Sequence, residues 1–530
     1  MNTAVSGGES ADAIDRAPTG ITAFVGRTLK GPVNEPVAVG SLAEFQQRFG
    51  GLWQPATLSY AVEQYFEMGG RRAVIVRVAN GARAPTLTLP AGGGRLTLTG
   101  VNPGSREYLR AAVDYDGISP SEPERFNLIV QRVRMPGSEL IEQQEILRRL
   151  SVEPDSPRFI TRVLEQSPLV RTLGEVPRAR PERTSASPGG PLARYVASNH
   201  DGDDGAPLSD YDVIGSTARA TGLFALKPEV DCDLVCIPPL SREQDVGMST
   251  LLVAARLCRE RNAMLVVDPP AAWTSTSAAL EAVRTWPFRS DNAVMFFPRV
   301  LAFDRLRNRF ETFGSSAAAA GFMARSDQSS GAWTAAPPED AVLRPGLRPL
   351  VTVADVERAR LAQAGINTLQ AVRSSARQGA HARTLASGCA GSSGGRYLPS
   401  RRLALHIVAS VERGTRWLIE EPNAPDAWAR AQAQVADFLA SLDRRGAFVG
   451  ERAEERYFVI CDERVNRPQT IAEGKVNLLV GFAMVRPGEF YTSLITQEAF
   501  GSRSRPVAVN RLATARQRVE WEIETSILRS

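Results

Sequence analysis

The sequence predicts a multidomain protein of mixed α/β and α+β structure. The chain has 530 residues, whereas single domains usually hold about 100 to 200, so we expect about three units. Helical patterns alternate with buried strands in an opening block and again between 210 and 298, which favours sheets covered by helices. Between those blocks lie short runs of alternating polar and apolar residues, which predict hairpin strands.

The chain opens with an expected arm followed by one compact layer. Residues 1–20 are small, polar and mildly acidic and show no apolar period, so they predict an amino-terminal arm. Residues 21–81 form the layer, and the run ITAFVG at 21–26 predicts its first strand.

The layer continues with two helices and a strand. Ser41 begins the first helix and has Glu44 three residues later, as in a capping box. An apolar stripe at helical spacing predicts a second helix from about Leu58 to Met68. The run AVIVRVA at 73–79 then predicts a buried strand, which makes the opening βαβ-like.

Two further domains follow. Residues 82–195 contain the short alternating runs and predict an inserted, strand-rich outer domain. Residues 196–394 predict a central α/β domain with strands near 231–238, 264–268 and 292–297 and a helix near 247–262. The last part of this domain is rich in glycine, serine and proline and predicts loops.

A last ordered domain is expected over residues 395–500. Its pattern predicts a helix at about 401–413, a strand at RWLIEE (416–421) and a long helix at about 426–445, and then three strands, ERYFVIC, VNLLVGFAMV and EFYTSLIT. The remaining residues, 501–530, are basic and predict a carboxy-terminal arm.

Composition and motifs argue against several functions. The 63 basic and 58 acidic residues nearly balance and are scattered, which disfavours nucleic-acid binding, and the longest apolar runs are too short for membrane insertion. Of the basic residues, 60 are arginines. Two explanations of this excess stay open: a GC-rich genome, or the use of arginine at protein interfaces.

Catalytic and metal-binding signals are weak. The chain has three histidines, and these lie in different segments: His200, His381 and His406. The acidic run at 200–204 lacks the spacing of a calcium loop, and GSSGG at 391–395 lacks the strand and helix of a nucleophile elbow. We therefore predict no enzyme, no catalytic residue, no cofactor and no metal.

Several segments, taken together and in order, resemble contractile tail sheath proteins of phages and related injection systems. The resemblance begins with PTGITAFVGRTLKGPVNEPVAVGSLAEFQQRFGG at 18–51 and continues with VVDPP at 266–270, FFPRV at 296–300 and GINTLQAV at 365–372. It closes with YLPSRRLALHIVASVERGTRWLIEEPNAPDAWARAQ at 397–432. A family segment similar to SPGVYVEE is absent, and Ala380 and His381 replace a tryptophan-glycine pair.

The resemblance implies a fold and an assembly. It implies a discontinuous core from the amino- and carboxy-terminal segments, an inserted strand-rich outer domain and extended terminal arms. The chain is then expected to form a helical homo-oligomer of stacked rings around an inner tail tube protein, and to contract by rigid-body rearrangement. Further expected partners are baseplate and tail terminator proteins. The expected location is a virion tail or injection particle assembled in the cytoplasm of a bacterial host.

One helix is the expected contact with the tube, and other functions stay open. The candidate contact residues are Asp426, Trp428, Arg430, Asp437, Arg444 and Arg445. An ordinary amphipathic surface helix explains the same pattern. The alternative functions are a sheath-like baseplate or collar component and an α/β enzyme built on residues 210–300.

Overall fold

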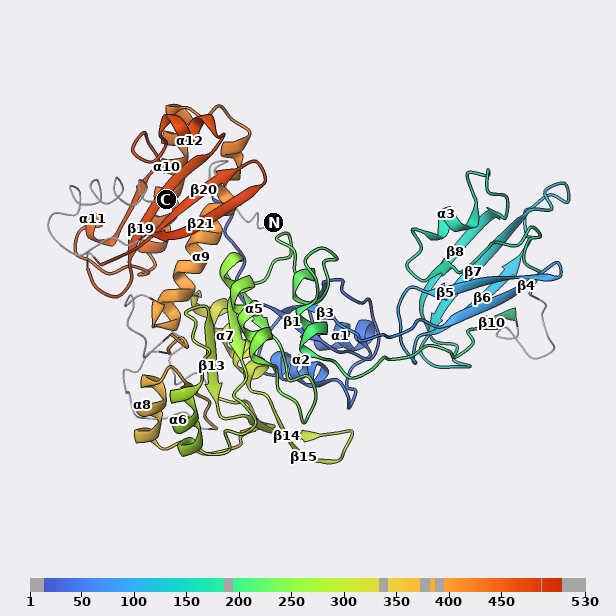
Figure 1. Ribbon diagram of the computed structural model, residues 1–530, viewed down its shortest axis with the longest axis horizontal. Coiled ribbons are helices and arrows are strands. Elements are labelled where there is room, and N and C mark those ends of the chain that lie inside the picture. The colour runs from blue at the N-terminus through green and yellow to red at the C-terminus, as the bar shows by residue number, and fades with distance from the viewer. Residues whose placement is uncertain are drawn as a thin grey trace, which may run out of the picture.

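The protein consists of three lobes (Figure 1). The computed structural model describes residues 14–184, 194–332, 342–371, 382–386, 395–487 and 489–507. We call the three lobes the central block (18–81 and 200–386), the outer lobe (82–199) and the carboxy-terminal lobe (395–507). The central block lies between the other two, and its sheet and helices confirm the mixed α/β multidomain class.

The central block is built on a seven-stranded sheet in the order β17-β13-β12-β11-β1-β3-β2. These strands are β1 (Ile21–Gly26), β2 (Val37–Val39), β3 (Arg72–Arg77), β11 (Leu234–Cys236), β12 (Met264–Val267), β13 (Ala293–Phe297) and β17 (Asn367–Thr368). All neighbouring strands run parallel except β2, which is antiparallel to β3. Parallel strands buried on both faces are continuously apolar, which is why the sequence predicted them well.

Helices cover both faces of this sheet. One face carries α1 (Leu42–Phe49), α2 (Thr57–Glu67) and α7 (Ser316–Ser330), and the other carries α4 (Asp210–Ile214), α5 (Met248–Glu260), α6 (Thr276–Thr285), α8 (Asp355–Gln363) and the short 3-10 helix η2 (Gly222–Ala225). The predicted start of α1 is confirmed, because the Ser41 hydroxyl accepts the backbone N–H of Glu44 at 3.2 Å. Gly50 ends that helix at a φ of 88°, a left-handed conformation that favours glycine. Helices α7 and α8 were not predicted.

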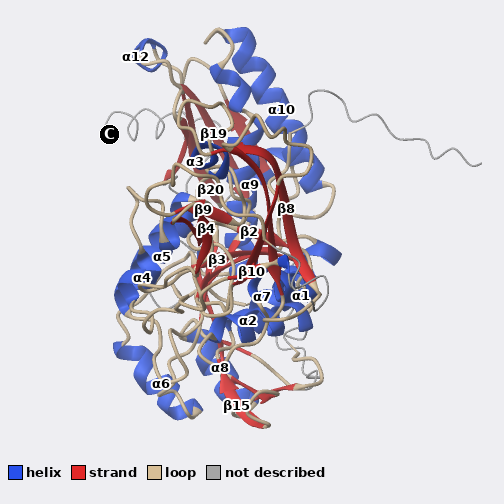
Figure 2. Cartoon of the chain, turned by 90° about the vertical axis from the view of Figure 1, so that its right-hand side faces the viewer, coloured by secondary structure: helices blue, strands red, loops and turns tan. Residues whose placement is uncertain are grey.

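A small antiparallel sheet extends from the lower end of the central block. It contains β14 (Val300–Asp304), β15 (Arg309–Phe313) and β16 (Leu347–Pro349), with β14 in the middle. Strands β14 and β15 form a hairpin that projects away from the block in both views (Figures 1 and 2).

The outer lobe contains two antiparallel sheets, as the alternating runs predicted. One has the order β10-β6-β7-β8 and the other β4-β5-β9. The strands are β4 (Thr86–Ala91), β5 (Gly94–Gly100), β6 (Tyr108–Asp114), β7 (Arg125–Val133), β8 (Ile141–Ser151), β9 (Val170–Thr172) and β10 (Val196–Ala197), joined by helix α3 (Ile160–Leu164). The two sheets enclose a hydrophobic core that consists of residues of this lobe alone.

Two extended segments form a narrow neck between the outer lobe and the central block (Figure 1). They pair through single antiparallel bridges, Asn80 with Ala206 and Arg83 with Asp203. The predicted turn at 200–204 belongs to this neck. There Asp204 accepts the backbone N–H of Ser105 at 2.9 Å, and so its carboxylate is bound within the chain.

The carboxy-terminal lobe has a sheet of its own, in the order β18-β19-β20-β21. Its elements are α9 (Leu398–Gly414), the 3-10 helix η5 (Arg416–Ile419), α10 (Pro425–Asp443), α11 (Ala453–Arg456), β18 (Tyr457–Ile460), α12 (Pro468–Ala472), β19 (Val476–Ala483), β20 (Phe490–Glu498) and β21 (Gly501–Val507). Strand β21 pairs with β20 along its whole length, so the sheet continues past residue 500, where the sequence predicted an arm.

The strand predicted at RWLIEE is wrong, because residues 416–419 form η5 instead. Strand β20 lies beside this segment, but within the described chain no strand pairs with it, and the turn directs Trp417 and Leu418 into packing contacts. Leu418 enters the hydrophobic core of the lobe, and the Trp417 indole donates a hydrogen bond to Gln434 on α10 at 3.0 Å. Tertiary packing therefore overrides a local preference for strand.

The two ends of the chain meet, but they do not build one sheet. The amino-terminal strands β1 to β3 share their sheet with strands from the middle of the chain, whereas the carboxy-terminal lobe is separate. Residues 14–17 contact that lobe: Ile14 is buried in its core, and the Ala17 N–H donates to Ser410 on α9 at 3.0 Å. Residues 1–13 and 508–530, most of the two predicted arms, lie outside the described residues.

Candidate assembly interface

Helix α10 presents two faces, as its pattern predicted. Pro425 occupies the first turn, where its missing N–H costs nothing, and Asp426 beside it complements the positive end of the helix. The buried face packs on the sheet of the lobe and consists of Ala427, Trp428, Ala431, Val435, Phe438, Leu439 and Leu442. The opposite face is solvent-exposed, so α10 is an amphipathic surface helix.

Five of the six candidate contact residues are exposed. Asp426, Arg430, Asp437 and Arg444 follow one another at spacings that return to the same side of a helix, and Arg445 lies just past its end. The sixth, Trp428, lies on the buried face at 4% exposure, and its indole donates to Asn423 at 2.7 Å. Trp428 therefore anchors the helix to its own lobe.

Arg430 is held in place by its neighbours. Its guanidinium stacks over the Trp417 ring at 3.9 Å and pairs with Glu421. The charged stripe along α10 thus contains one cation fixed by η5, an element whose fold the sequence did not predict.

A shallow groove of about 670 Å³ runs beside α10. Its floor is formed by small and apolar side chains of the helix, among them Ala429, Ala433 and Ala436, and its far wall by residues 461–464 after β18. The sequence did not indicate this groove, because its two walls are separated by about one helix and one strand of chain.

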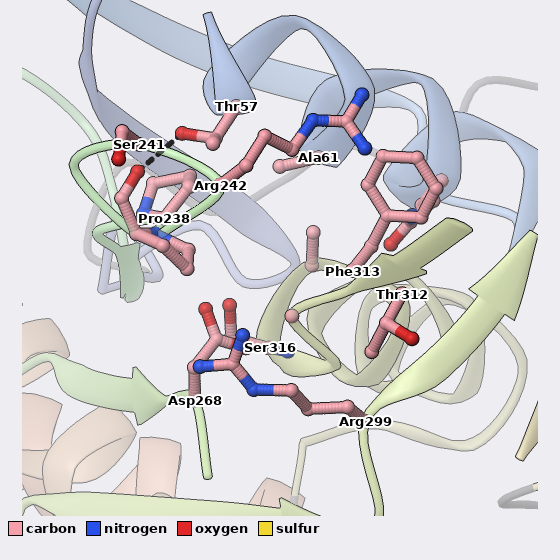
Figure 3. A pocket seen from close by; sticks show the side chains of 14 residues that line it. Thr57, Ala61, Pro238, Ser241, Arg242, Asp268, Arg299, Thr312, Phe313 and Ser316 are labelled. Carbon is pink, nitrogen blue, oxygen red and sulfur yellow. Dashed lines mark hydrogen bonds between the residues drawn. The ribbon is translucent and has the colours of Figure 1, made fainter. Parts of the chain in front are cut away.

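Among the described residues, the cavity at the usual ligand-binding edge of the central sheet is small. Parallel α/β sheets bind ligands at the carboxyl ends of their strands. Asp268, Arg299 and Ser316 lie close together at that edge (Figure 3). Asp268 accepts the Ser316 N–H at 2.7 Å, and Arg299 donates to the Pro269 carbonyl at 2.9 Å. The cavity there measures about 20 Å³, room for about one water molecule. Burial raises the pKa of the Asp268 carboxyl.

The other chemical candidates do not converge on one place. His200 lies in the neck and His406 on α9, where burial lowers the pKa of its imidazole to about 4, while His381 and most of 391–395 lie outside the described residues. Within the part of the chain that the structure describes, no group of three or more metal-ligating side chains occurs. No described helix has the length and apolar character needed to cross a bilayer.

The fold that these three lobes form is similar to those of solved contractile sheath proteins. The chain is similar to the sheath of an extracellular contractile injection system, the PVC sheath complex in its contracted state, with a TM-score of 0.52 and 18% identity over 92% of this chain and 95% of that one. It is also similar to the sheath tail protein Lin1278 from Listeria innocua, with a TM-score of 0.58 and 12% identity over 92% and 97% of the two chains.

Comparison of the sequence with protein-family models and with curated proteins finds no match. Since both structural relatives are less than 25% identical to this chain, the likeness is one of fold. It extends over nearly the whole length of each protein. The chain therefore has the sheath-protein fold predicted from its sequence.

Proposed function

We propose that this chain is a structural subunit of a contractile sheath. It polymerises helically around an inner tube and contracts by rigid-body rearrangement, which drives the tube through a target envelope. The observation that carries this proposal is the likeness over 92% of the chain to a sheath in its contracted state. Baseplate and tail terminator proteins are the proposed partners at the two ends of the sheath. The particle is a virion tail or injection particle assembled in the cytoplasm of a bacterial host.

The lobed architecture supports such a rearrangement. Head-to-tail contacts whose rotation does not close produce an open helix of subunits. Each lobe has a packed core, so subunits can exchange contacts without unfolding. Contraction then needs no nucleotide, because the free energy lies in subunit contacts that form only in the contracted array.

Negative-stain microscopy of the purified full-length protein tests the proposal. Hollow, striated cylinders are the expected particles. Small rings or plates would instead indicate a baseplate or collar component, and discrete monomers under all assembly conditions would contradict a sheath role.

The exposed stripe of α10 is the proposed contact with the tube. Replacing both Arg444→Glu and Arg445→Glu changes the local charge by four units and should abolish co-sedimentation of the sheath with tube protein. The matched control is Arg256→Glu with Arg259→Glu, an equal charge change at exposed positions on α5. Tube attachment that survives the first pair as well as the second would refute this contact.

The carboxy-terminal segment is proposed to interlock subunits, with its basic charge facing the acidic residues of 1–15. A deletion of 503–530 would also remove most of β21 from its own sheet, which confounds the test. A deletion of 508–530 leaves β21 intact. We expect this shorter deletion to prevent tube formation while thermal unfolding stays unchanged, and normal cylinders would exclude the interlock.

A further inference from the structure

The β14–β15 hairpin exposes an unusual group of apolar side chains. Phe303 and Phe310 are directly paired across the two strands and remain 48% and 51% exposed, with their rings 5.6 Å apart. Leu306 in the turn between them is 48% exposed. Two adjacent exposed phenylalanines at a projecting tip are typical of a surface that binds another protein.

Arginines surround this aromatic pair. Arg305 and Arg309 are 67% and 65% exposed, and the Arg348 guanidinium lies 5.6 Å from the Phe310 ring. Arg305, Arg307 and Arg309 pair with Glu63 or Glu311, and Glu67 also lies near Arg305, so four arginines face three carboxylates. The tip is therefore apolar with a basic rim, and aromatic residues and arginine are the residues most enriched at interface hot spots.

The groove beside α10 has the complementary properties. Its floor is apolar, and its volume of about 670 Å³ lies within the ~300–1,000 Å³ of pockets that hold groups larger than two phenyl rings. The charged residues that line the groove are Asp462, Glu463 and Arg464, and Arg464 pairs with Asp462. The groove therefore has one more carboxylate than cations.

The hairpin and the groove lie at opposite ends of the molecule. Both views place β15 at the bottom and α10 at the top (Figures 1 and 2). One chain therefore cannot fill its own groove. A second copy can, and a contact between two different surfaces repeats head to tail, which gives an open helix where the rotation between copies does not close a ring.

We propose that the β14–β15 hairpin of one subunit docks into the α10 groove of the next, with Phe303 and Phe310 against the alanine floor and the arginines against its carboxylates. This inference rests on the proposed self-assembly and specifies one of its contacts. Binding by a basic aromatic tip in an acidic groove also predicts that the contact weakens with rising salt.

Site-specific cross-linking tests the contact in the full-length protein. One preparation carries Phe310→Cys and a second, distinguishable by a tag, carries Ala433→Cys; both positions are exposed. A short bis-maleimide should join the two preparations into mixed dimers. The control pair replaces Phe310→Cys with Leu252→Cys, which is 56% exposed on α5, and should give at most a tenth of that product. An equal yield from both pairs would overturn the proposal.

Charge exchange separates docking from misfolding. Arg305→Glu with Arg309→Glu should reduce the mixed dimer by about tenfold, the size expected for loss of a hot-spot contact. Glu463→Arg on the groove copy should restore it, and failure of this rescue would count against the contact.

The hairpin contact and the sheath function can be confirmed or contradicted separately. Cylinders that form without the 310–433 cross-link would overturn the hairpin contact and leave the sheath function standing. The cross-link in discrete short oligomers would support the contact and contradict the sheath function.

Discussion

The outer lobe and the carboxy-terminal lobe are attached to the central block in opposite ways. Within the described chain, the core of the outer lobe shares no buried residue with the central block. The carboxy-terminal lobe instead shares helix α9 with it. Leu398 and Leu405 of α9 belong to the core of the central block, and Leu403 and Ile407 belong to the core of the carboxy-terminal lobe.

The polar contacts of the two attachments also differ in their exposure to solvent. At the neck the Asp201 carboxylate accepts hydrogen bonds from the N–H and hydroxyl of Thr86 at an exposed position. On α9 the Arg402 guanidinium is buried and donates to Asp327 at 2.6 Å and to Asp233 at 2.9 Å. Asp233 in turn accepts the Ile21 N–H at 2.7 Å, so this ion cluster joins α9 to the first strand of the central sheet.

This difference indicates which joint can move. Tilting the outer lobe breaks exposed hydrogen bonds that water can replace, together with the Lys30–Glu142 ion pair and one hydrogen bond from the buried Arg77 to the Pro103 carbonyl, but it opens no shared apolar core. Tilting the carboxy-terminal lobe would separate an apolar interface and leave buried charges unpaired, which is costly. We therefore expect the central block and the carboxy-terminal lobe to unfold together, and the outer lobe to be an independent unit.

The largest expected effect comes from breaking the buried cluster. Arg402→Leu leaves Asp327 and Asp233 without their cation and should destabilise the protein by about 3–5 kcal/mol. Denaturant unfolding measures this loss of stability, and hydrogen exchange of the native protein shows where protection falls. Protection should fall in the central block and the carboxy-terminal lobe together, while amides of β6 and β7 in the outer lobe keep theirs.

Arg413→Leu is the matched control for Arg402→Leu. It lies on the same helix and pairs with Asp15 and Asp231, but it is 46% exposed, so its loss should cost at most about 1 kcal/mol. Similar losses from the two variants, or reduced protection in the outer lobe, would contradict the distinction between the joints.

A pH effect of intermediate size is expected at the other end of α9. Burial raises the pKa of the Glu412 carboxyl to about 7, and that group accepts a hydrogen bond from Asn262 at 2.7 Å. Because the folded state holds this proton more tightly than the unfolded chain does, the stabilisation is complete below about pH 4.5 and is lost as pH rises to about 7.

Glu412→Gln isolates this contribution, since the amide keeps the hydrogen-bond acceptor and cannot titrate. Between pH 4.5 and 7 the free energy of unfolding of the unmodified protein should fall by roughly 2–3 kcal/mol relative to the variant. Parallel stability curves for the two proteins over that range would show that Glu412 does not titrate in the folded state.

The central sheet could be predicted from sequence, while α7 could not. Strands β1, β3, β12 and β13 are mainly apolar on both faces because helices cover both sides of the sheet. Helix α7 begins with four alanines after Ser316 and lies so close to α2 that a Cβ on Gly321 would approach the Tyr65 carbonyl to 2.5 Å. The small residues that allow this close approach give no amphipathic period. The sequence pattern therefore did not predict helix α7.

The candidate interface was predictable where it depends on one helix and unpredictable where it depends on several. Helical spacing alone identified the charges of α10 that the structure shows to be exposed. The groove needs the loop at 461–464 to lie beside that helix, which follows from the order of the sheet. The hairpin at 300–313 was not predicted, and only the tertiary structure shows that Phe303 and Phe310 stay uncovered.

The smallest expected effect lies at the neck. Asp204→Ala removes the acceptor for the Ser105 N–H and hydroxyl, which bond to its carboxylate at 2.9 and 2.6 Å. Because the site is exposed, water takes over much of this role, and global stability should change by about 1 kcal/mol or less. Hydrogen exchange at Ser105 and protease cleavage within 199–205 should nevertheless rise. Asp116→Ala, which removes an exposed partner of Arg183 in the same lobe, should leave both unchanged. A large loss of global stability from Asp204→Ala would mean that the neck is as tightly coupled to the central block as α9, and the outer lobe would then move with it as one body.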